Sequence, residues 1–212
     1  MNMDKKLEQY LARHSSPEDP VLEDLSRQTY IRFVNPNMIT GLIQGKLLEF
    51  ISVMLKPGLA LEIGTYTGYS AICLAKGLKQ GGKLYTIEIN DELKEFSHSY
   101  FFKAGLESSI IQINGRAQDI IPEMKQTFDL VYIDGDKREY TEYYNIVIDK
   151  IKSGGFIIAD NVLWGNKVLD NNNKDPQTRG INEFNEMIRK QTNIEKLILP
   201  VRDGVMLIRK LS

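Results

Sequence analysis

Cysteine is almost absent from this chain of 212 residues, which has only Cys73. One thiol excludes an internal disulfide and suits a reducing compartment, so we expect a cytoplasmic protein. Cys73 falls in a predicted helix, where a small core residue is a more ordinary reading than a nucleophile. Histidine is also scarce. His14 and His98 both fall inside predicted helices and not at strand ends, so neither is expected to bind a ligand.

An excess of charge of either sign is missing as well. Lysine and arginine number 27 and aspartate and glutamate 28, which gives a formal net charge of −1. This balance gives no support to a general attraction to nucleic acid or to membrane surfaces. The first 14 residues carry charges where a signal peptide needs an apolar core. No apolar run approaches the roughly 20 residues of a membrane span, so we expect no membrane association.

The length suits one domain with a sizeable core, which we place over residues 1–212. Before residue 59 the pattern predicts helices only, and we interpret residues 1–58 as a helical cap in front of an α/β core over 59–212. The expected helices of the cap cover 3–14, 18–33 and a stretch that opens at Thr40 and ends at Lys56-Pro57-Gly58.

From Leu59 onward, apolar runs alternate with helical patterns, which predicts βαβ units. We expect strands over 59–63, 83–89, 109–114, 128–133, 154–159, 194–199 and 204–210, and helices over 68–79, 91–104, 117–126, 138–151 and 179–191. The fold class is therefore α/β, a seven-stranded and mostly parallel sheet with helices on both faces. Only residues 200–203 separate the last two strands, which predicts an antiparallel edge hairpin. The polar stretch 165–180 is expected to be a long surface loop.

The stretch LALEIGTYTGYS, residues 59–70, predicts a strand, a tight turn and a helix around a ligand. Gly64 permits close approach because it has no Cβ. Glu62 ends the strand, where a carboxylate would repel a pyrophosphate and favour a cationic ligand such as S-adenosylmethionine. Glu88 follows 24 residues after Gly64, at a position suited to ribose hydroxyls, although it could instead cap the next helix. The loop lacks the third glycine of a dinucleotide fingerprint, which favours S-adenosylmethionine over NAD.

Two further strand ends offer hard oxygen ligands: Asp134 follows one strand, and Asp160 and Asn161 follow the next. Such a set suits Mg²⁺, Mn²⁺ or Ca²⁺ and not zinc. The alternative is that Asp160 and Asn161 form a turn or a helix cap, as such residues usually do. Lys137 lies three residues after Asp134, which returns its ammonium group to the side of that carboxylate. It could act as a base beside a cation, or it could be an exposed, solvated lysine.

Two residues near these strand ends stay ambiguous in the sequence. Asp136 either supports the residues that bind the ligand or simply faces solvent, and the second interpretation is favoured. Trp164 is either a core residue or a flat wall beside an aromatic substrate.

The motifs LEIGTYTGYS, YTIEIN, YIDGDK, ADNVLWG and PVRDGVMLIRK occur together in this order. In this, residues 36–210 resemble the cation-dependent class I O-methyltransferases, the group that includes caffeoyl-CoA O-methyltransferase and, more distantly, catechol O-methyltransferase. The resemblance implies a Rossmann-like class I methyltransferase fold. It also implies that the metal ligands are Asp134, Asp160 and Asn161 and that Lys137, with Asp134, is catalytic. The implied residues for S-adenosylmethionine are Met38, Thr40, Glu62, Gly64, Thr65, Ser70, Glu88, Ala117 and Asp134.

The resemblance predicts a metal-dependent O-methyltransferase that uses S-adenosylmethionine and Mg²⁺ to methylate one hydroxyl of a catechol-like vicinal diol on a small molecule. An alternative acceptor is a 5-hydroxyuridine at the wobble position of tRNA, and a further alternative is a non-catalytic protein that binds S-adenosylmethionine. The tRNA acceptor would need basic residues around the pocket. Candidates are Lys46, Arg116, Lys137, Arg138, Lys167, Lys174, Arg179 and Arg202. Relatives are commonly dimers, so we expect a homodimer.

Overall fold

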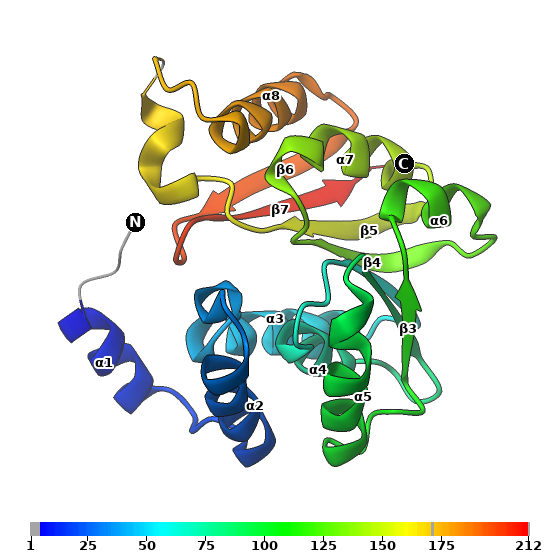
Figure 1. The fold of residues 1–212 in the computed structure, drawn as a ribbon. Coiled ribbons are helices and arrows are strands. Elements are labelled where there is room, and N and C mark those ends of the chain that lie inside the picture. The colour runs from blue at the N-terminus through cyan, green and yellow to red at the C-terminus, as the bar shows by residue number, and fades with distance from the viewer. Residues whose placement is uncertain (1–4, 171, 212) are drawn as a thin grey trace. The chain divides into compact units, whose positions relative to one another are not determined.

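The structure, a computed structural model, describes residues 5–170 and 172–211. Its chain divides into two compact units (Figure 1). The first unit comprises residues 59–64 and 116–211, and the second comprises residues 5–58 and 65–115. The expected division into a cap over 1–58 and a core over 59–212, within one domain, stays a prediction.

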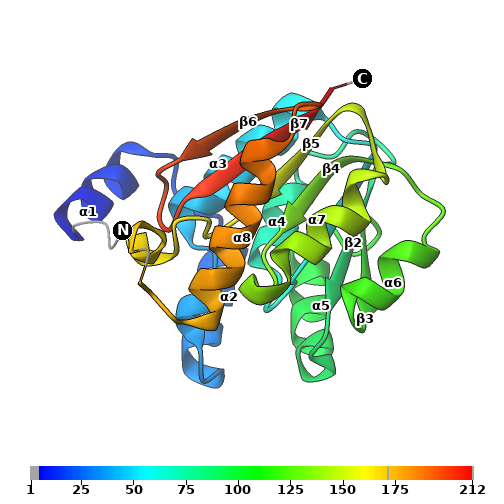
Figure 2. The same ribbon diagram turned by 90° about the horizontal axis from the view of Figure 1, so that it is seen from above.

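The first unit is built on five strands in the order β1-β4-β5-β7-β6. They are β1 (Leu59–Ile63), β4 (Phe128–Ile133), β5 (Ile151–Ala159), β7 (Val205–Lys210) and β6 (Ile194–Leu199). β1, β4 and β5 run parallel, while β7 pairs antiparallel with both β5 and β6. The helical segments are α6 (Ala117–Glu123), η3 (Lys137–Glu139), α7 (Tyr140–Ile148), η4 (Trp164–Leu169) and α8 (Pro176–Lys190). α7 and α8 cover the same face of these strands (Figures 1 and 2).

The register of the three parallel strands aligns their carboxyl ends. Ile63 pairs with Ile133, and Ile133 pairs with Ala159. The ladder extends one residue further, because the Asp134 N–H donates to the Ile63 carbonyl at 2.8 Å and the Asp160 N–H donates to the Ile133 carbonyl at 3.0 Å. The residues that directly follow the strands therefore emerge side by side at one edge, where ligands of open α/β sheets bind.

The second unit contains the parallel pair β2 (Lys83–Glu88) and β3 (Ile110–Asn114). Its helices are α1 (Lys5–His14), α2 (Pro20–Arg32), η1 (Pro36–Met38), α3 (Leu42–Leu55), α4 (Tyr69–Ala75), η2 (Asp91–Leu93) and α5 (Lys94–Lys103). α2 begins where the Asp19 carboxylate accepts the Val21 N–H at 2.8 Å, with Pro20 in the first turn. α3 ends at Lys56, whose φ of 48° cannot continue a helix.

The predicted fold class is confirmed: the seven-stranded sheet is mostly parallel and has an antiparallel edge pair. The predicted bounds of β1, β4 and β6 match the structure, whereas β5 begins at Ile151 instead of 154. The predicted loop over 165–180 is wrong at both ends, because η4 and the start of α8 lie inside it. The third cap helix begins at Leu42 and not at Thr40, because Gly41 with a φ of 74° precedes it. Residues 3 and 4 of the first expected helix lie outside the described residues.

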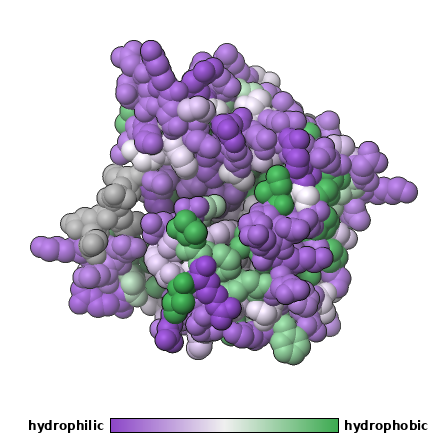
Figure 3. Space-filling model, in the orientation of Figure 1, coloured by the Kyte–Doolittle hydropathy of each residue, from purple (hydrophilic) through white to green (hydrophobic). Residues whose placement is uncertain are grey.

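The expectation that no stretch approaches a membrane span needs correction, because residues Pro36–Leu55 pass that test by length and composition. In the structure this stretch is η1 followed by α3, and α3 packs against α4. Its polar residues Gln44 and Ser52 are buried, and the Ser52 hydroxyl donates to the Leu74 carbonyl at 2.6 Å. One face of α3 is therefore buried in its unit, whereas Phe50, Val53 and Met54 are exposed. The surface in Figure 3 is mainly hydrophilic, with small separate groups of hydrophobic atoms.

Gly64 directly follows β1 and lies against the backbone at the end of β4. Its φ is 96°, and a Cβ added there would lie 2.3 Å from the Asp134 carbonyl oxygen. Any side chain at this position would therefore push the end of β4 away and break the alignment of the strand ends.

We expect Gly64→Ala to lower the free energy of unfolding by about 3 kcal/mol or more, because it combines backbone strain with a backbone clash. Gly81→Ala is the matched control, since Gly81 has a φ of 76° and nothing within 4 Å of an added Cβ. The control should lose only the strain, about 1 kcal/mol. Urea unfolding of both variants measures the difference, and equal losses would contradict the clash.

Candidate active site

Asp134 and Lys137 are brought together by the turn that joins β4 to η3. Asp136 begins η3, because its carboxylate accepts the Arg138 N–H at 2.9 Å, and it also pairs with the Arg138 guanidinium group. The tight turn that follows carries the Lys137 amino group back to the Asp134 carboxylate, at an Nζ–Oδ1 distance of 2.7 Å. Asp136 is thus a partly exposed cap residue that shapes the turn.

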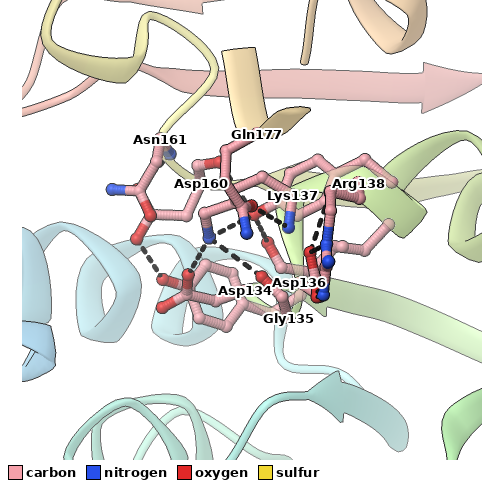
Figure 4. A network of polar contacts seen from close by, with 11 residues as sticks. Asp134, Gly135, Asp136, Lys137, Arg138, Asp160, Asn161 and Gln177 are labelled. Atoms are coloured by element: carbon pink, nitrogen blue, oxygen red, sulfur yellow. Dashed lines mark hydrogen bonds and ion pairs between the residues drawn. The ribbon is translucent and has the colours of Figure 1, made fainter. Parts of the chain in front are cut away.

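Lys137 is buried, and all its amino protons have acceptors. Only 6% of the residue is exposed, which excludes the solvated surface lysine considered from the sequence. Besides Asp134, its Nζ contacts the Gly135 carbonyl at 3.2 Å and the Tyr140 hydroxyl at 2.8 Å. Figure 4 shows Lys137 together with Asp134 and Gly135 in this network. A buried ammonium needs such a complete set of partners.

Asp160 and Asn161 follow β5, and the structure brings Asp160 into the same network. Asp160 is 3% exposed, and its carboxylate accepts the Asn161 N–H at 2.7 Å and the Tyr132 hydroxyl at 2.9 Å. Its main-chain carbonyl accepts the Tyr140 hydroxyl at 2.9 Å. Asn161 has a φ of 55°, a conformation that asparagine tolerates better than most residues. Tyr140 therefore links the lysine at one strand end to the aspartate at the next.

The electrostatics of the cluster follow from its burial. Burial raises the pKa of Asp134 to about 6; the charge of Lys137 opposes this shift and that of Asp160 adds to it. Burial also raises the pKa of Tyr132 and of Tyr140 well above the usual range, and the neighbouring carboxylates reinforce that effect. Both tyrosines are therefore neutral phenols. The positive charge of Arg202 also acts on Asp134 and lowers its pKa.

Trp164 lies at the rim of the cluster. Its ring centroid is 6.0 Å from the Lys137 Nζ, and its indole N–H donates to the Asp175 carboxylate at 3.2 Å. Asp175 also begins α8 by accepting the Thr178 N–H at 3.2 Å. The indole is partly exposed. This position is compatible with the predicted substrate wall and not with a core residue.

α8 packs closely against the backbone of Lys137. The Gln177 side-chain oxygen accepts the Lys137 N–H at 3.1 Å. At Gly180, an added Cβ would lie 2.4 Å from the Lys137 carbonyl oxygen, so only glycine allows this approach. The helix thus holds the turn that positions the lysine.

The first unit also contains Glu62, Gly64 and Ala117 from the predicted cofactor set. Glu62 is fully buried on β1, in register with Tyr132 of β4. Ala117 is 5% exposed and begins α6. A fully buried carboxylate at a strand end is costly unless a positive group meets it, so Glu62 suits a cationic ligand.

In the second unit, Glu88 is held with both carboxylate oxygens engaged. The Tyr66 N–H donates to one oxygen at 2.7 Å, and the Asn90 N–H donates to the other at 3.0 Å. A carboxylate oriented by backbone groups, and only partly buried, has lone pairs left for two vicinal hydroxyls. The alternative, that Glu88 caps the next helix, does not apply, because Asn90 caps η2.

The other predicted cofactor residues of the second unit differ in exposure. Thr65, Ser70 and Thr40 are buried, and the Thr65 and Thr86 hydroxyls lie 2.5 Å apart. Met38 is 60% exposed at the end of η1. An exposed methionine on a short segment can cover a ligand at little conformational cost.

Sequence reasoning missed four residues of this site, namely Tyr132, Tyr140, Asp175 and Gln177. Tyr140 carried one usable signal, since it lies three residues after Lys137 and therefore on the same side of a helical turn. Asp175 precedes Pro176, a helix start that the polar context concealed. Tyr132 and Gln177 gave no signal, because their partners come from distant parts of the sequence.

Among the described residues, no group of three or more His, Cys, Asp or Glu side chains could hold a metal ion. The predicted ligand set contains only two carboxylates, with the Asn161 amide as its third member, so this finding on groups of three such side chains does not test it.

Six of the eight basic residues considered for tRNA have a carboxylate partner in the described structure. The pairs are Lys46–Glu49, Arg116–Glu139, Lys137–Asp134, Arg138–Asp136, Lys167–Asp175 and Arg179–Glu183.

The sequence matches a family model described as O-methyltransferase over residues 12–211. Catechol O-methyltransferase of Niastella koreensis is 35% identical over 170 residues, which are 78% of this chain and 74% of that relative. Caffeoyl-CoA O-methyltransferase of Petroselinum crispum is 32% identical over 188 residues, which are 82% of this chain and 78% of that relative.

Solved structures show the same similarity across nearly the whole chain. The O-methyltransferase TomG of Streptomyces achromogenes, in complex with SAM, has a TM-score of 0.90 and 29% identity over 98% of this chain and 96% of its own. The O-methyltransferase of Bacillus cereus, in complex with SAH, has a TM-score of 0.90 and 28% identity over 97% of each chain. This chain therefore belongs to the O-methyltransferase family, as the resemblance of its motifs implied.

Proposed function

We propose that the protein transfers the methyl group of S-adenosylmethionine to one hydroxyl of a catechol-like vicinal diol on a small molecule, with a divalent metal ion such as Mg²⁺. The observation that carries the proposal is the contact between the buried Lys137 and the partly buried Asp134, in a network that includes the Asp160 carbonyl. A buried amino group that pairs with the Asp134 carboxylate and is linked through Tyr140 to the Asp160 main chain, at the carboxyl ends of parallel strands, is an arrangement for handling a proton.

S-adenosylmethionine fits the residues that the motifs single out. Glu62 offers a buried negative charge for the methionyl amine, and the conformation of Gly64 leaves no room for a side chain beside Asp134. Glu88 is oriented for ribose hydroxyls by two backbone N–H groups. Relatives solved with SAM or SAH support the same donor.

A divalent metal ion fits the chemistry of the donor set. Asp134 and Asp160 would supply carboxylate oxygens and Asn161 an amide oxygen, which are the hard ligands that Mg²⁺ prefers. When bound, the cation supplies Lewis acidity that lowers the pKa of the acceptor hydroxyl.

Lys137 then takes the proton of that hydroxyl at its Nζ. A phenol with a pKa near 10 is mostly protonated at neutral pH, so a base is required. A nearby divalent charge favours the neutral form of the amine. The resulting phenolate attacks the methyl group in line and yields a methyl ether and S-adenosylhomocysteine. Trp164 stacks on the aromatic acceptor and helps exclude water, which matters because the reaction joins opposite charges.

A small molecule is favoured over tRNA because most of the basic candidates have carboxylate partners. Recognition of RNA needs unneutralised basic surface for phosphates. A role in binding S-adenosylmethionine without catalysis is disfavoured by the buried lysine. The homodimer and the cytoplasmic location stay predictions.

Removal of the metal ion should abolish the reaction. We expect EDTA to stop methylation of a catechol and added Mg²⁺ to restore it. Asp160→Asn should lower kcat/KM by about 100-fold, because it removes a charged ligand. Asp136→Asn is the matched control, since Asp136 caps η3 and should cost only a few-fold in activity. A rate that is unchanged by EDTA would make the metal-dependent mechanism untenable.

The acceptor should need two adjacent hydroxyls. A methyl-transfer assay with Mg²⁺ should give product from catechol and none above background from phenol, because one hydroxyl cannot chelate. Undermodified tRNA that carries 5-hydroxyuridine is assayed in parallel under identical conditions. Faster methylation of that tRNA than of every catechol in the panel would replace the small-molecule acceptor by tRNA.

A further inference from the structure

Tyr140 lies in the active site, but the proposed reaction gives it no role. It begins α7, three residues after Lys137, and is fully buried. Its ring packs edge-on against Phe184 of α8, with centroids 5.5 Å apart and planes at 88°. Contacts of this kind fix the ring, so the hydroxyl has little freedom of its own.

The Tyr140 hydroxyl contacts the backbone at the ends of both β4 and β5. Its proton points toward the carbonyl oxygens of Asp160, at 2.9 Å, and of Ile133, at 3.2 Å. Its oxygen accepts a hydrogen bond from the Lys137 Nζ at 2.8 Å. These carbonyls belong to the backbone and cannot rotate away. The tyrosine hydroxyl is therefore a fixed acceptor for the lysine.

The Lys137 side chain has four rotatable bonds and would otherwise sample many positions. Its Nζ donates to three groups, namely Asp134 at 2.7 Å, the Tyr140 hydroxyl at 2.8 Å and the Gly135 carbonyl at 3.2 Å. The contact with Asp134 is the weaker constraint during turnover, because that carboxylate is also a proposed ligand of the metal ion. Two partners of the Lys137 Nζ do not depend on what the Asp134 carboxylate binds, namely the Tyr140 hydroxyl at 2.8 Å and the Gly135 carbonyl at 3.2 Å, and the tyrosine contact is the shorter.

We propose that Tyr140 is a positioning residue, whose hydroxyl holds the Lys137 Nζ at the point where it takes the proton of the acceptor hydroxyl. This inference rests on the proposed function, in which Lys137 is the base. Tyr140 itself does not touch the acceptor and transfers no proton. Its contribution is orientation, and misplacement of a reacting group by about 1 Å costs as much as 100-fold in rate.

The test uses Tyr140→Phe, which removes the hydroxyl and keeps the ring that packs on Phe184. We expect kcat for a catechol to fall about 10- to 100-fold. The KM for the catechol and the Kd for S-adenosylmethionine, measured by calorimetry, should stay within about twofold, because neither binding step uses this hydroxyl. Tyr143→Phe is the matched control. Tyr143 lies on the same helix, and its hydroxyl donates to Glu139 at 2.6 Å instead of contacting the lysine.

A double-mutant cycle separates orientation from structural damage. Lys137→Met should lower kcat by about 100-fold or more. Adding Tyr140→Phe to Lys137→Met should change kcat by less than about threefold, because the tyrosine then has no lysine to hold. Thermal unfolding and the donor Kd of each variant report whether the fold is intact.

Three results would overturn the role of Tyr140: an unchanged kcat in Tyr140→Phe, an equal loss in Tyr143→Phe, or losses that multiply in the double variant. Failure of the proposed function is recognised separately. If Lys137→Met keeps the rate of the unmodified enzyme, Lys137 is not the base, and the inference about Tyr140 fails with it. If Tyr140→Phe keeps the kcat of the unmodified enzyme while Lys137→Met lowers it, the inference about Tyr140 is overturned and the proposed function stands.

Discussion

The parallel register of β1, β4 and β5 is the constraint on which the active site depends. Because Ile63, Ile133 and Ala159 lie in line, the next residue of each strand emerges at the same edge. A shift of one residue would turn every side chain to the opposite face. Gly64 keeps this alignment, since its lack of a side chain lets the first strand end lie against the Asp134 carbonyl.

The alignment of the strand ends places Asp134 and Asp160 close together, and neighbouring residues stabilise the two carboxylates. Two aspartates at neighbouring strand ends would repel each other in a buried setting. Lys137 supplies one positive charge, the Tyr132 hydroxyl donates to the Asp160 carboxylate, and the Tyr140 hydroxyl donates to the Asp160 main-chain carbonyl. Arg202 adds a further positive charge that acts on Asp134 and lowers its pKa. The proposed metal ion therefore rests on the nature of the ligands, which are two carboxylates and one amide.

The strands and their polar ends were predictable because the signals are local. β1 and β4 are apolar runs that stop at a glycine or an aspartate, and both bounds were correct. The start of α8 was missed, since Asp175 and Pro176 stand in a polar stretch that resembles a loop. Tyr140 was missed for a different reason: a buried tyrosine at helical spacing reads as core. Only its contacts with Lys137 and Asp160, which lie 23 residues apart in the chain, reveal its position.

Backbone strain near the active site is concentrated after Asp160. Asn161, Trp164 and Asn166 all have positive φ values, of 55°, 44° and 64°. Each costs on the order of 1 kcal/mol and persists only where other contacts impose it. The hydrogen bond from the Trp164 indole to Asp175 is such a contact, and it holds the ring near Lys137. The strained backbone and the contact with Asp175 thus act together to fix the indole beside Lys137, at the rim where the proposed acceptor would stack.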